Sequence, residues 1–362
     1  MSAPARLVCN SRERSGGKGE ERGSRDAAAH SSSRDPLAGV SVLLLTKNGE
    51  RYLAELLEGV SRQEGTFSLR EVIAVDSGSR DRTLEILRRF AVKIIQIPPQ
   101  AFGHGKTRNL AAAHAQGEYL VFLTQDATPV DERWLDNLLA PLRADPEIAG
   151  AYSRQLPRPH CHPMEWRRIV QQELSGAPES RVSRVLNNPD YARNPGFYYF
   201  FSNVSAVLRQ SIWKRFPLAT SETAASEFAE DQLWAKQVLE AGYKTAYCAD
   251  SLVYHSHSYG PWDNFGRHFD HAWALLRGPF TRPYQIAFTE CVPLALRAAR
   301  ADLAFWRHLS GQSKIRVSRQ WAAPAVSWHL AANFGLWLGE WADRLPNRLC
   351  SFLSYQERVK QR

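Results

Sequence analysis

The chain has 362 residues, of which 44% are hydrophobic and 11% aromatic, enough to build one large domain with an appendage. Its net charge of +9 and pI of about 9.4 favour anionic partners such as nucleotides, anionic lipid or nucleic acid, although an ordinary basic soluble protein has the same balance. The five cysteines form no CxxC pair, the N-terminus has no signal-peptide core, and no run of about 18 apolar residues occurs, so we expect a cytoplasmic protein that is neither exported by a signal peptide nor membrane-spanning.

Three segments differ in composition. Residues 1–38 are rich in Ser, Arg, Gly and Glu and poor in large apolar side chains. They cannot bury enough surface to offset the entropy of ordering, so we expect a disordered tail. Residues 39–280 are expected to form an α/β domain, and residues 281–362 a helical appendage.

Strand and helix patterns alternate in the first half of the α/β domain. The predicted strands are Val40–Thr46, Glu71–Val75, Val92–Ile97 and Tyr119–Leu123. The predicted helices are Arg51–Arg62, Arg82–Phe90, one that follows Gly103-His104-Gly105 and is ended by Gly117, and Asp131–Leu142. This alternation predicts a mostly parallel sheet with helices on both faces, right-handed crossovers, and strand ends that meet at one edge.

The pattern is less regular in the second half. Many prolines and arginines from about residue 150 to 198 predict loops and short helices over the site. Further on, we predict a strand at Tyr199–Leu208, a helix at Asp231–Ala241 ended by Gly242, short strands at Lys244–Cys248 and Leu252–Tyr254, and helices over 262–278 and much of the chain beyond 285.

Charged residues flank the strand Tyr119–Leu123. Thr124-Gln125-Asp126 follows it, and the preceding helix carries Lys106, Arg108 and Asn109. Cations beside a lone carboxylate suit a nucleotide diphosphate with a divalent metal, because phosphate oxygens and waters can fill the positions that one Asp leaves open. The alternatives are a solvated arginine and an Asp that only caps the next helix.

Other carboxylates and imidazoles stand at element ends. Asp76 can accept from a base N–H or a ribose hydroxyl, although Ser79 can cap the next helix without any ligand. Asp231 opens a helix, whose dipole should hold it ionised as a base, although a simple capping box fits too. His255 and His257 alternate after a strand, so both can face the site. A zinc site with His268 and His271 would need a tetrahedral cluster, and no cysteine has suitable spacing.

In their order and spacing these motifs resemble family 2 glycosyltransferases with the GT-A fold, from about Val40 to His257. Thr46 and Asn48 match the family's T-x-N, and the R-N and E-D motifs are also present. The family's DDGSxDxT pattern is matched at Asp76, Gly78, Ser79, Asp81 and Thr83, with Ser77 in place of the second Asp. Thr124 replaces the first Asp of the DxD motif, which leaves the metal dependence less strict than in a full motif.

The resemblance implies inverting transfer of a sugar from a nucleoside-diphosphate sugar to a glycan or lipid-linked saccharide in cell-surface polysaccharide synthesis. Asp231 would be the catalytic base, and Mg²⁺ or Mn²⁺ would be held by Asp126 and His255. The donor would be bound by Thr46, Asn48, Asp76, Ser79, Arg108, Gln125 and Asp126.

Further stretches resemble bacterial rhamnosyltransferase-like members, in which they border the donor sugar and the acceptor. They place six residues near the sugar or acceptor: Arg154, Gln155, Ser202, Asn203, Glu230 and Trp234. Loop packing and a core strand explain the same residues equally well. The expected donor is dTDP-rhamnose, while UDP- and GDP-sugars share the other features.

The stretch 320–354 is rich in tryptophan. Beyond Pro324, apolar residues recur at helical spacing at Leu330, Phe334, Trp337, Trp341 and Leu345. Two interpretations fit equally: an amphipathic helix on the anionic inner face of the cell membrane, or a helix whose tryptophans pack on the catalytic domain.

Two other classes of protein share parts of this pattern. A nucleotidyltransferase should carry a lysine- and glycine-rich loop after the first strand, and Thr46–Gly49 is too short for one. A non-catalytic nucleotide- or anion-binding protein remains an alternative. We expect no nucleic-acid partner, because carboxylates at the site edge repel phosphate backbones.

Overall fold

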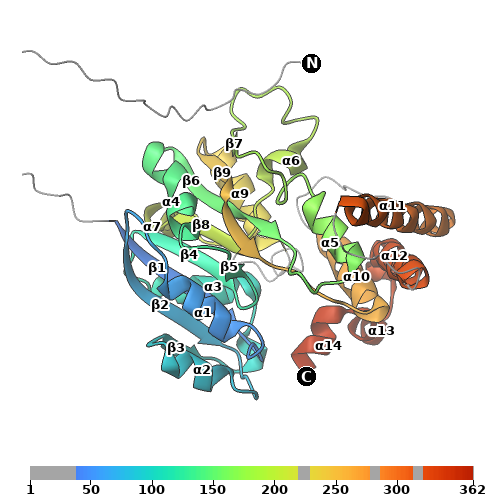
Figure 1. The fold of residues 1–362 in the computed structure, drawn as a ribbon, viewed down its shortest axis with the longest axis horizontal. Coiled ribbons are helices and arrows are strands. Elements are labelled where there is room, and N and C mark those ends of the chain that lie inside the picture. The colour runs from blue at the N-terminus through green and yellow to red at the C-terminus, as the bar shows by residue number, and fades with distance from the viewer. Residues whose placement is uncertain (1–37, 219–228, 278–285, 313–320, 362) are drawn as a thin grey trace, which may run out of the picture. The chain divides into compact units, whose positions relative to one another are not determined.

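The computed structural model describes residues 38–218, 229–277, 286–312 and 321–361. The predicted tail lies outside these residues, apart from its last residue. Within them, a mixed sheet has strands in the order β3-β2-β1-β4-β8-β6-β9-β5, and β7 pairs with β9 (Figure 1). The strands are β1 Gly39–Thr46, β2 Ser68–Asp76, β3 Lys93–Gln96, β4 Tyr119–Thr124, β5 Thr128–Pro129, β6 Ile148–Leu156, β7 Arg181–Ser183, β8 Ser205–Arg209 and β9 Lys244–Tyr254.

Helices cover both faces of this sheet and continue beyond it. The helices of the sheet domain are α1 Leu53–Ser61, α2 Thr83–Arg89, η1 Pro99–Ala101, α3 His104–Ala113, α4 Trp134–Ala144, α5 Pro163–Val170, α6 Pro195–Tyr199, α7 Gln210–Arg215 and α9 Glu230–Glu240. The carboxyl-terminal helices, orange to red in Figure 1, are α10 Pro261–Arg277, η2 Phe288–Glu290, α11 Cys291–Gln312, α12 Ala322–Gly339, η4 Ala342–Arg344, α13 Asn347–Leu353 and α14 Tyr355–Gln361.

The predicted parallel arrangement of the first four strands is confirmed. β1 pairs in parallel with β2 and β4, and β2 with β3. Thr46 therefore lies beside Asp76, and Leu45 beside Thr124. The polar ends of β1, β2 and β4 meet at one edge, as expected for parallel strands.

Each face of the sheet packs against its own hydrophobic core. Along β1, Val42 and Leu44 enter one hydrophobic core with α1 and α4, while Leu43 enters the other with α3 and α9. This alternation follows from the two-residue period of a strand. β1 is therefore buried on both faces, and its carboxyl end lies at the edge where the polar strand ends meet.

The end of α3 differs from the prediction. The helix ends at Ala113 and not at Gly117. Gly117 instead lies against β1: its N–H donates to Ser41 Oγ (2.9 Å), and a Cβ there would lie 2.5 Å from Ser41 N. The glycine is needed for this close approach and not as a helix cap.

The second half of the sheet also differs from the prediction. The strand predicted at Tyr199–Leu208 begins only at Ser205, as β8, and Tyr199 is the last residue of helix α6. The two short strands predicted at Lys244–Cys248 and Leu252–Tyr254 form one strand, β9. β6 runs through Ile148–Leu156, where loops were expected. Its Ala- and Gly-rich sequence has weak strand propensity, but pairing with both β8 and β9 outweighs this.

Most of the predicted tryptophan-rich stripe is used for packing. α12 lies between α10 and α11, and glycines allow close contact: a Cβ on Gly335 would lie 2.3 Å from Phe265 O. The Trp337 ring packs on Phe288 (5.0 Å between centroids), while Trp341 lies beyond the helix end and is 41% exposed. Among the described residues, no helix combines the length and apolar character that a membrane span requires.

Candidate active site

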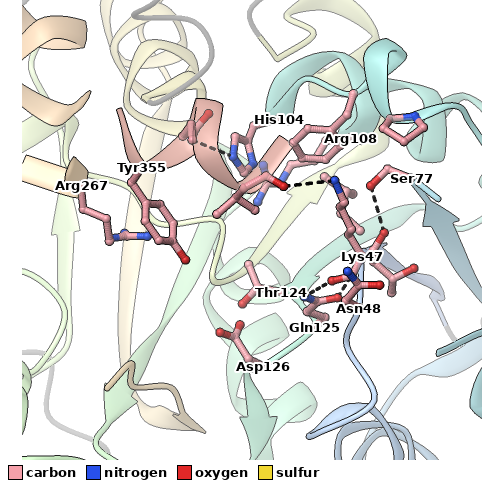
Figure 2. A pocket seen from close by; sticks show the side chains of 16 residues that line it. Lys47, Asn48, Ser77, His104, Arg108, Thr124, Gln125, Asp126, Arg267 and Tyr355 are labelled. Atoms are coloured by element: carbon pink, nitrogen blue, oxygen red, sulfur yellow. Dashed lines mark hydrogen bonds between the residues drawn. The ribbon is translucent and has the colours of Figure 1, made fainter. Parts of the chain in front are cut away.

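The edge where β1 and β4 end opens into a cavity of about 490 Å³ (Figure 2). Strand ends are where open α/β sheets bind ligands, and this volume is typical of small-molecule sites. The walls come from the strand exits, from η1 and α3, and from α10 and α14. The lining residues are Leu45, Thr46, Lys47, Asn48, Ser77, Pro99, Phe102, His104, Arg108, Thr124, Gln125, Asp126, Arg267, Tyr355, Gln356 and Val359.

Asp76 shapes the wall of the cavity but does not line it. Its carboxylate is fully buried and accepts four hydrogen bonds, from Gly78 N (3.1 Å), Ser79 N (3.0 Å), Thr46 Oγ1 (3.1 Å) and the Ser79 hydroxyl. These bonds occupy the lone pairs of both oxygens. The donor contact predicted for Asp76 and Ser79 would therefore require this loop to rearrange.

The other five predicted donor residues all line the cavity: Thr46, Asn48, Arg108, Gln125 and Asp126. The side-chain amide of Gln125 accepts from Lys47 N (2.9 Å) and donates to Lys47 O (3.0 Å), so it ties the end of β4 to the end of β1. Ser77 also lines the cavity. It stands where the family pattern has its second Asp, which is the feature of the sequence that could have identified it.

Three potential metal ligands converge beside the cavity. Asp126 Oδ1 lies 3.8 Å from His255 Nε2, and Asp126 Oδ2 lies 3.5 Å from His257 Nδ1. The ligand atoms of all three residues lie within 4.8 Å of one another. The predicted pair of Asp126 and His255 is thus brought together, and His257 joins it because alternate residues after β9 face the same way.

The protonation of both histidines is suited to metal binding. His255 Nδ1 lies 3.0 Å from Gln155 Oε1, so the proton sits on Nδ1 and the Nε2 lone pair faces Asp126. Burial lowers the pKa of His255, and burial together with the adjacent His255 lowers the pKa of His257 to about 3. Both rings are neutral at physiological pH, which metal binding requires.

The three potential ligands fit a divalent transition metal. One carboxylate and two imidazoles suit Mn²⁺ or a softer ion better than Mg²⁺, which prefers oxygen ligands. The cluster does not include His268 or His271, the other members of the zinc site considered from the sequence. His268 Nδ1 instead lies 2.8 Å from Asn264 O within α10.

The predicted base, Asp231, lies in the first turn of α9. Its Oδ2 accepts from Asn203 N (3.0 Å) and its Oδ1 from Gln232 N (2.8 Å). The adjacent Glu230 is buried and accepts from Arg108 Nη1 at 2.7 Å. Because Arg108 also lines the cavity, this ion pair connects the start of α9 to the cavity wall.

The protonation of Asp231 differs from the prediction. The helix dipole was expected to hold it ionised, but burial and the negative charge of Glu230 raise the pKa of Asp231 to about 7. A carboxyl group that titrates near neutral pH is well matched to general-base catalysis, because it can accept a proton with a larger driving force.

The predicted sugar- or acceptor-side residues have different environments. Gln155 donates to Ser202 Oγ (3.1 Å) while it holds His255, so both support the metal cluster. Arg154 precedes Gln155 on β6 and is not among the cavity-lining residues. Trp234 is fully buried in the core, where its Nε1 donates to Phe216 O (3.0 Å), so contact with a sugar would need the core to open.

The sequence is similar to that of known glycosyltransferases. A model of Glycosyl transferase family 2 matches residues 41–211. The chain is 32% identical over 233 residues to the O-antigen chain rhamnosyltransferase RfbN of Salmonella typhimurium, covering 64% of this chain and 70% of RfbN. It is 34% identical over 210 residues to WbaN, an O-antigen chain rhamnosyltransferase of Salmonella anatum, covering 58% of this chain and 63% of WbaN, which is less than two thirds. The site is that of a glycosyltransferase, and the chain belongs to glycosyltransferase family 2.

Two solved structures are similar to this chain over most of its length. TarS 1–349 of S. aureus is 20% identical, with 89% of this chain and 87% of that chain covered and a TM-score of 0.46. The mannosyltransferase PcManGT of Pyrobaculum calidifontis, solved with GDP-Man and Mn²⁺, is 20% identical, with 83% and 88% covered and a TM-score of 0.49. The strand order and the family together identify the mixed sheet between helical layers as the predicted GT-A fold.

Proposed function

We propose that this chain transfers rhamnose from dTDP-rhamnose, with inversion, to a saccharide or lipid-linked acceptor of a cell-surface polysaccharide. Its main support is the cluster of Asp126, His255 and His257. Asp126 lines the cavity, and so does Arg108, which is ion-paired with Glu230 beside Asp231. The similarity to two O-antigen chain rhamnosyltransferases supports this donor and this kind of acceptor.

The residues in and beside the cavity would each have a part in the reaction. Asp231 would take the proton of the acceptor hydroxyl as its oxygen forms a bond to the anomeric carbon. The bond from that carbon to the diphosphate oxygen breaks, and dTDP leaves with the electron pair. A divalent ion, held by Asp126, His255 and His257, would supply positive charge for the leaving diphosphate. Lys47 and Arg267 add cationic side chains to the same cavity.

The proposal is tested by the product released from each donor. The chain is incubated with Mn²⁺, a lipid-linked saccharide fraction, and dTDP-rhamnose, UDP-glucose or GDP-mannose in turn. We expect acceptor-dependent release of dTDP from dTDP-rhamnose. Release of UDP or GDP instead would show that the donor carries a different nucleotide. In a parallel incubation with dTTP and a sugar 1-phosphate, formation of inorganic diphosphate would favour a nucleotidyltransferase. No release from any donor would favour the non-catalytic alternative.

The raised pKa of Asp231 predicts an acid limb in the pH profile. A base must be ionised to accept a proton, so kcat/KM should fall as the pH drops below about 7. Replacing Glu230 by Gln removes the negative charge that, together with burial, raises the pKa of Asp231, so the acid limb should move to lower pH. Initial rates from about pH 5.5 to 8.5 measure this. A limb that is absent, or that Glu230→Gln leaves in place, would contradict the assignment.

We also propose a membrane contact through a small patch next to the cavity wall. Trp262, Leu349 and Phe352 are 45%, 40% and 62% exposed, and the rings of Trp262 and Phe352 lie 5.5 Å apart. Arg348 shares the helix α13 with two of them. Exposed aromatic side chains beside a cation suit the interface of an anionic bilayer, where a lipid-linked acceptor would be found.

Replacing Phe352 by Ser should weaken membrane binding roughly tenfold or more, because burial of such a ring is worth about 1.5–3 kcal/mol. Co-sedimentation with vesicles of phosphatidylcholine and phosphatidylglycerol measures it. Leu186→Ser is the matched control, since Leu186 is 47% exposed on the catalytic domain. Equal binding of the two variants, or no binding of the wild type, would exclude this patch as a membrane contact.

A further inference from the structure

The carboxyl-terminal helix α14 forms part of the cavity wall. Three of its residues, Tyr355, Gln356 and Val359, line the cavity together with Arg267 of α10. These residues lie far beyond the segment 41–211 that the family model matches. Figure 2 shows Tyr355 and Arg267 on the side of the cavity nearer to Asp126, and His104 close to the same helix.

Several contacts hold α14 in this place. Gln356 N donates to Asp270 Oδ2 (3.0 Å), and Arg358 Nη2 lies 3.2 Å from Asp263 Oδ1, so both ends of the first turn are attached to α10. Gly266 of α10 permits the close approach. A Cβ at this position would lie 2.9 Å from Leu353 O and 2.9 Å from Tyr355 N, two backbone atoms that cannot turn away.

The inner side of α14 meets the strand exits and α3. Lys47 Nζ donates to Val359 O at 3.4 Å, and Gln356 Nε2 lies 3.3 Å from His104 Nε2 (Figure 2). α14 therefore bridges the loop after β1 and the first turn of α3. Both of these segments belong to the cavity wall.

Tyr259 links α14 to the metal cluster. Its ring stacks on His257 (4.8 Å between centroids) and meets the Tyr355 ring edge-on (5.4 Å). Its hydroxyl accepts from Arg267 Nη1 at 3.0 Å. The helix and the cluster are thus in one continuous set of contacts, at the place where the diphosphate of a donor would lie.

We infer that α14 is part of the donor site, and that Tyr355 and Gln356 contact the bound nucleoside-diphosphate sugar on its diphosphate side. A phenol hydroxyl and an amide N–H are suitable donors to phosphate oxygens, and Arg267 beside them adds a positive charge. The inference rests on the proposed function, since it assigns further residues to the same donor cavity.

Calorimetric titration with dTDP and Mn²⁺ tests this assignment in the full chain. Tyr355→Phe and Gln356→Ala should each raise the Kd about tenfold, the usual effect of losing a hydrogen bond to a charged group. Gly266→Ala should raise it at least as much, because α14 must shift. Gly260→Ala is the matched control: a Cβ there has no neighbour within 4 Å, so its Kd should equal that of the wild type.

Hydrogen exchange separates a donor contact from a structural role. Addition of dTDP and Mn²⁺ to the wild type should slow exchange of the amides of α14, and this protection should be reduced in Tyr355→Phe. If Asp126→Ala loses dTDP binding while the three α14-directed variants bind like the wild type, the inference is overturned and the proposed function stands. If the wild type binds no nucleoside diphosphate, both are overturned.

Discussion

Replacing Asp231 by Asn should lower the rate of sugar transfer by about 10²–10⁴-fold, the usual contribution of a general base. An amide cannot accept the acceptor proton, but it keeps the size of the carboxyl group and can still accept from Asn203 N. Donor binding should therefore change by less than about twofold. The measurements are the transfer rate at saturating donor and the Kd for dTDP.

The matched control for this variant is Asp250→Asn, which makes the same change at an exposed position. It should retain the wild-type rate. An Asp231→Asn enzyme with more than about a tenth of the wild-type rate would exclude Asp231 as the base. Loss of dTDP binding in the same variant would indicate a binding role instead.

Replacing Asp126 by Ala should remove the metal-dependent part of donor binding, with a rise of about 100-fold or more in the Kd for dTDP in the presence of Mn²⁺. Asp126 is the sole carboxylate in the cluster, and the two neutral imidazoles bring no negative charge to offset the ion. Titration of Mn²⁺ followed by electron paramagnetic resonance measures the metal directly, without any need for turnover.

Gln155→Ala gives a graded version of the same test. Gln155 Oε1 accepts a hydrogen bond from His255 Nδ1, which orients the ring. Loss of such a supporting bond lowers metal affinity by about 10–100-fold. Glu132→Ala, which removes an exposed carboxylate outside the cluster, is the control and should bind Mn²⁺ as the wild type does. Unchanged Mn²⁺ binding in Asp126→Ala would place the metal elsewhere.

The parallel half of the sheet could be predicted from the sequence because its information is local. Val40–Thr46 and Tyr119–Leu123 are short apolar runs that end in polar residues, and parallel pairing then brings their ends together. β6 could not be found in this way. Its Ile148–Leu156 stretch has no distinctive period, and only its neighbours β8 and β9 make it a strand.

Site residues that belong to a sequence motif could be predicted. Contacts between segments far apart in the sequence could not. Asp126 and His255 come together as the sequence indicated. The contact between Lys47 and Val359 joins residues 312 positions apart, and no local pattern reports it. The pKa of Asp231 is set by burial and by Glu230, so the helix position alone predicted the wrong direction.

Calorimetric titration of dTDP with and without Mn²⁺ shows whether the cavity at the ends of β1 and β4 is a metal-dependent donor site. We expect dTDP to bind with Mn²⁺ present, to bind at least about tenfold more weakly with a chelator, and to exceed ATP in affinity under both conditions. Equal binding of dTDP with Mn²⁺ and with the chelator would exclude a metal from the donor site, and no binding under either condition would exclude a dTDP site in this cavity.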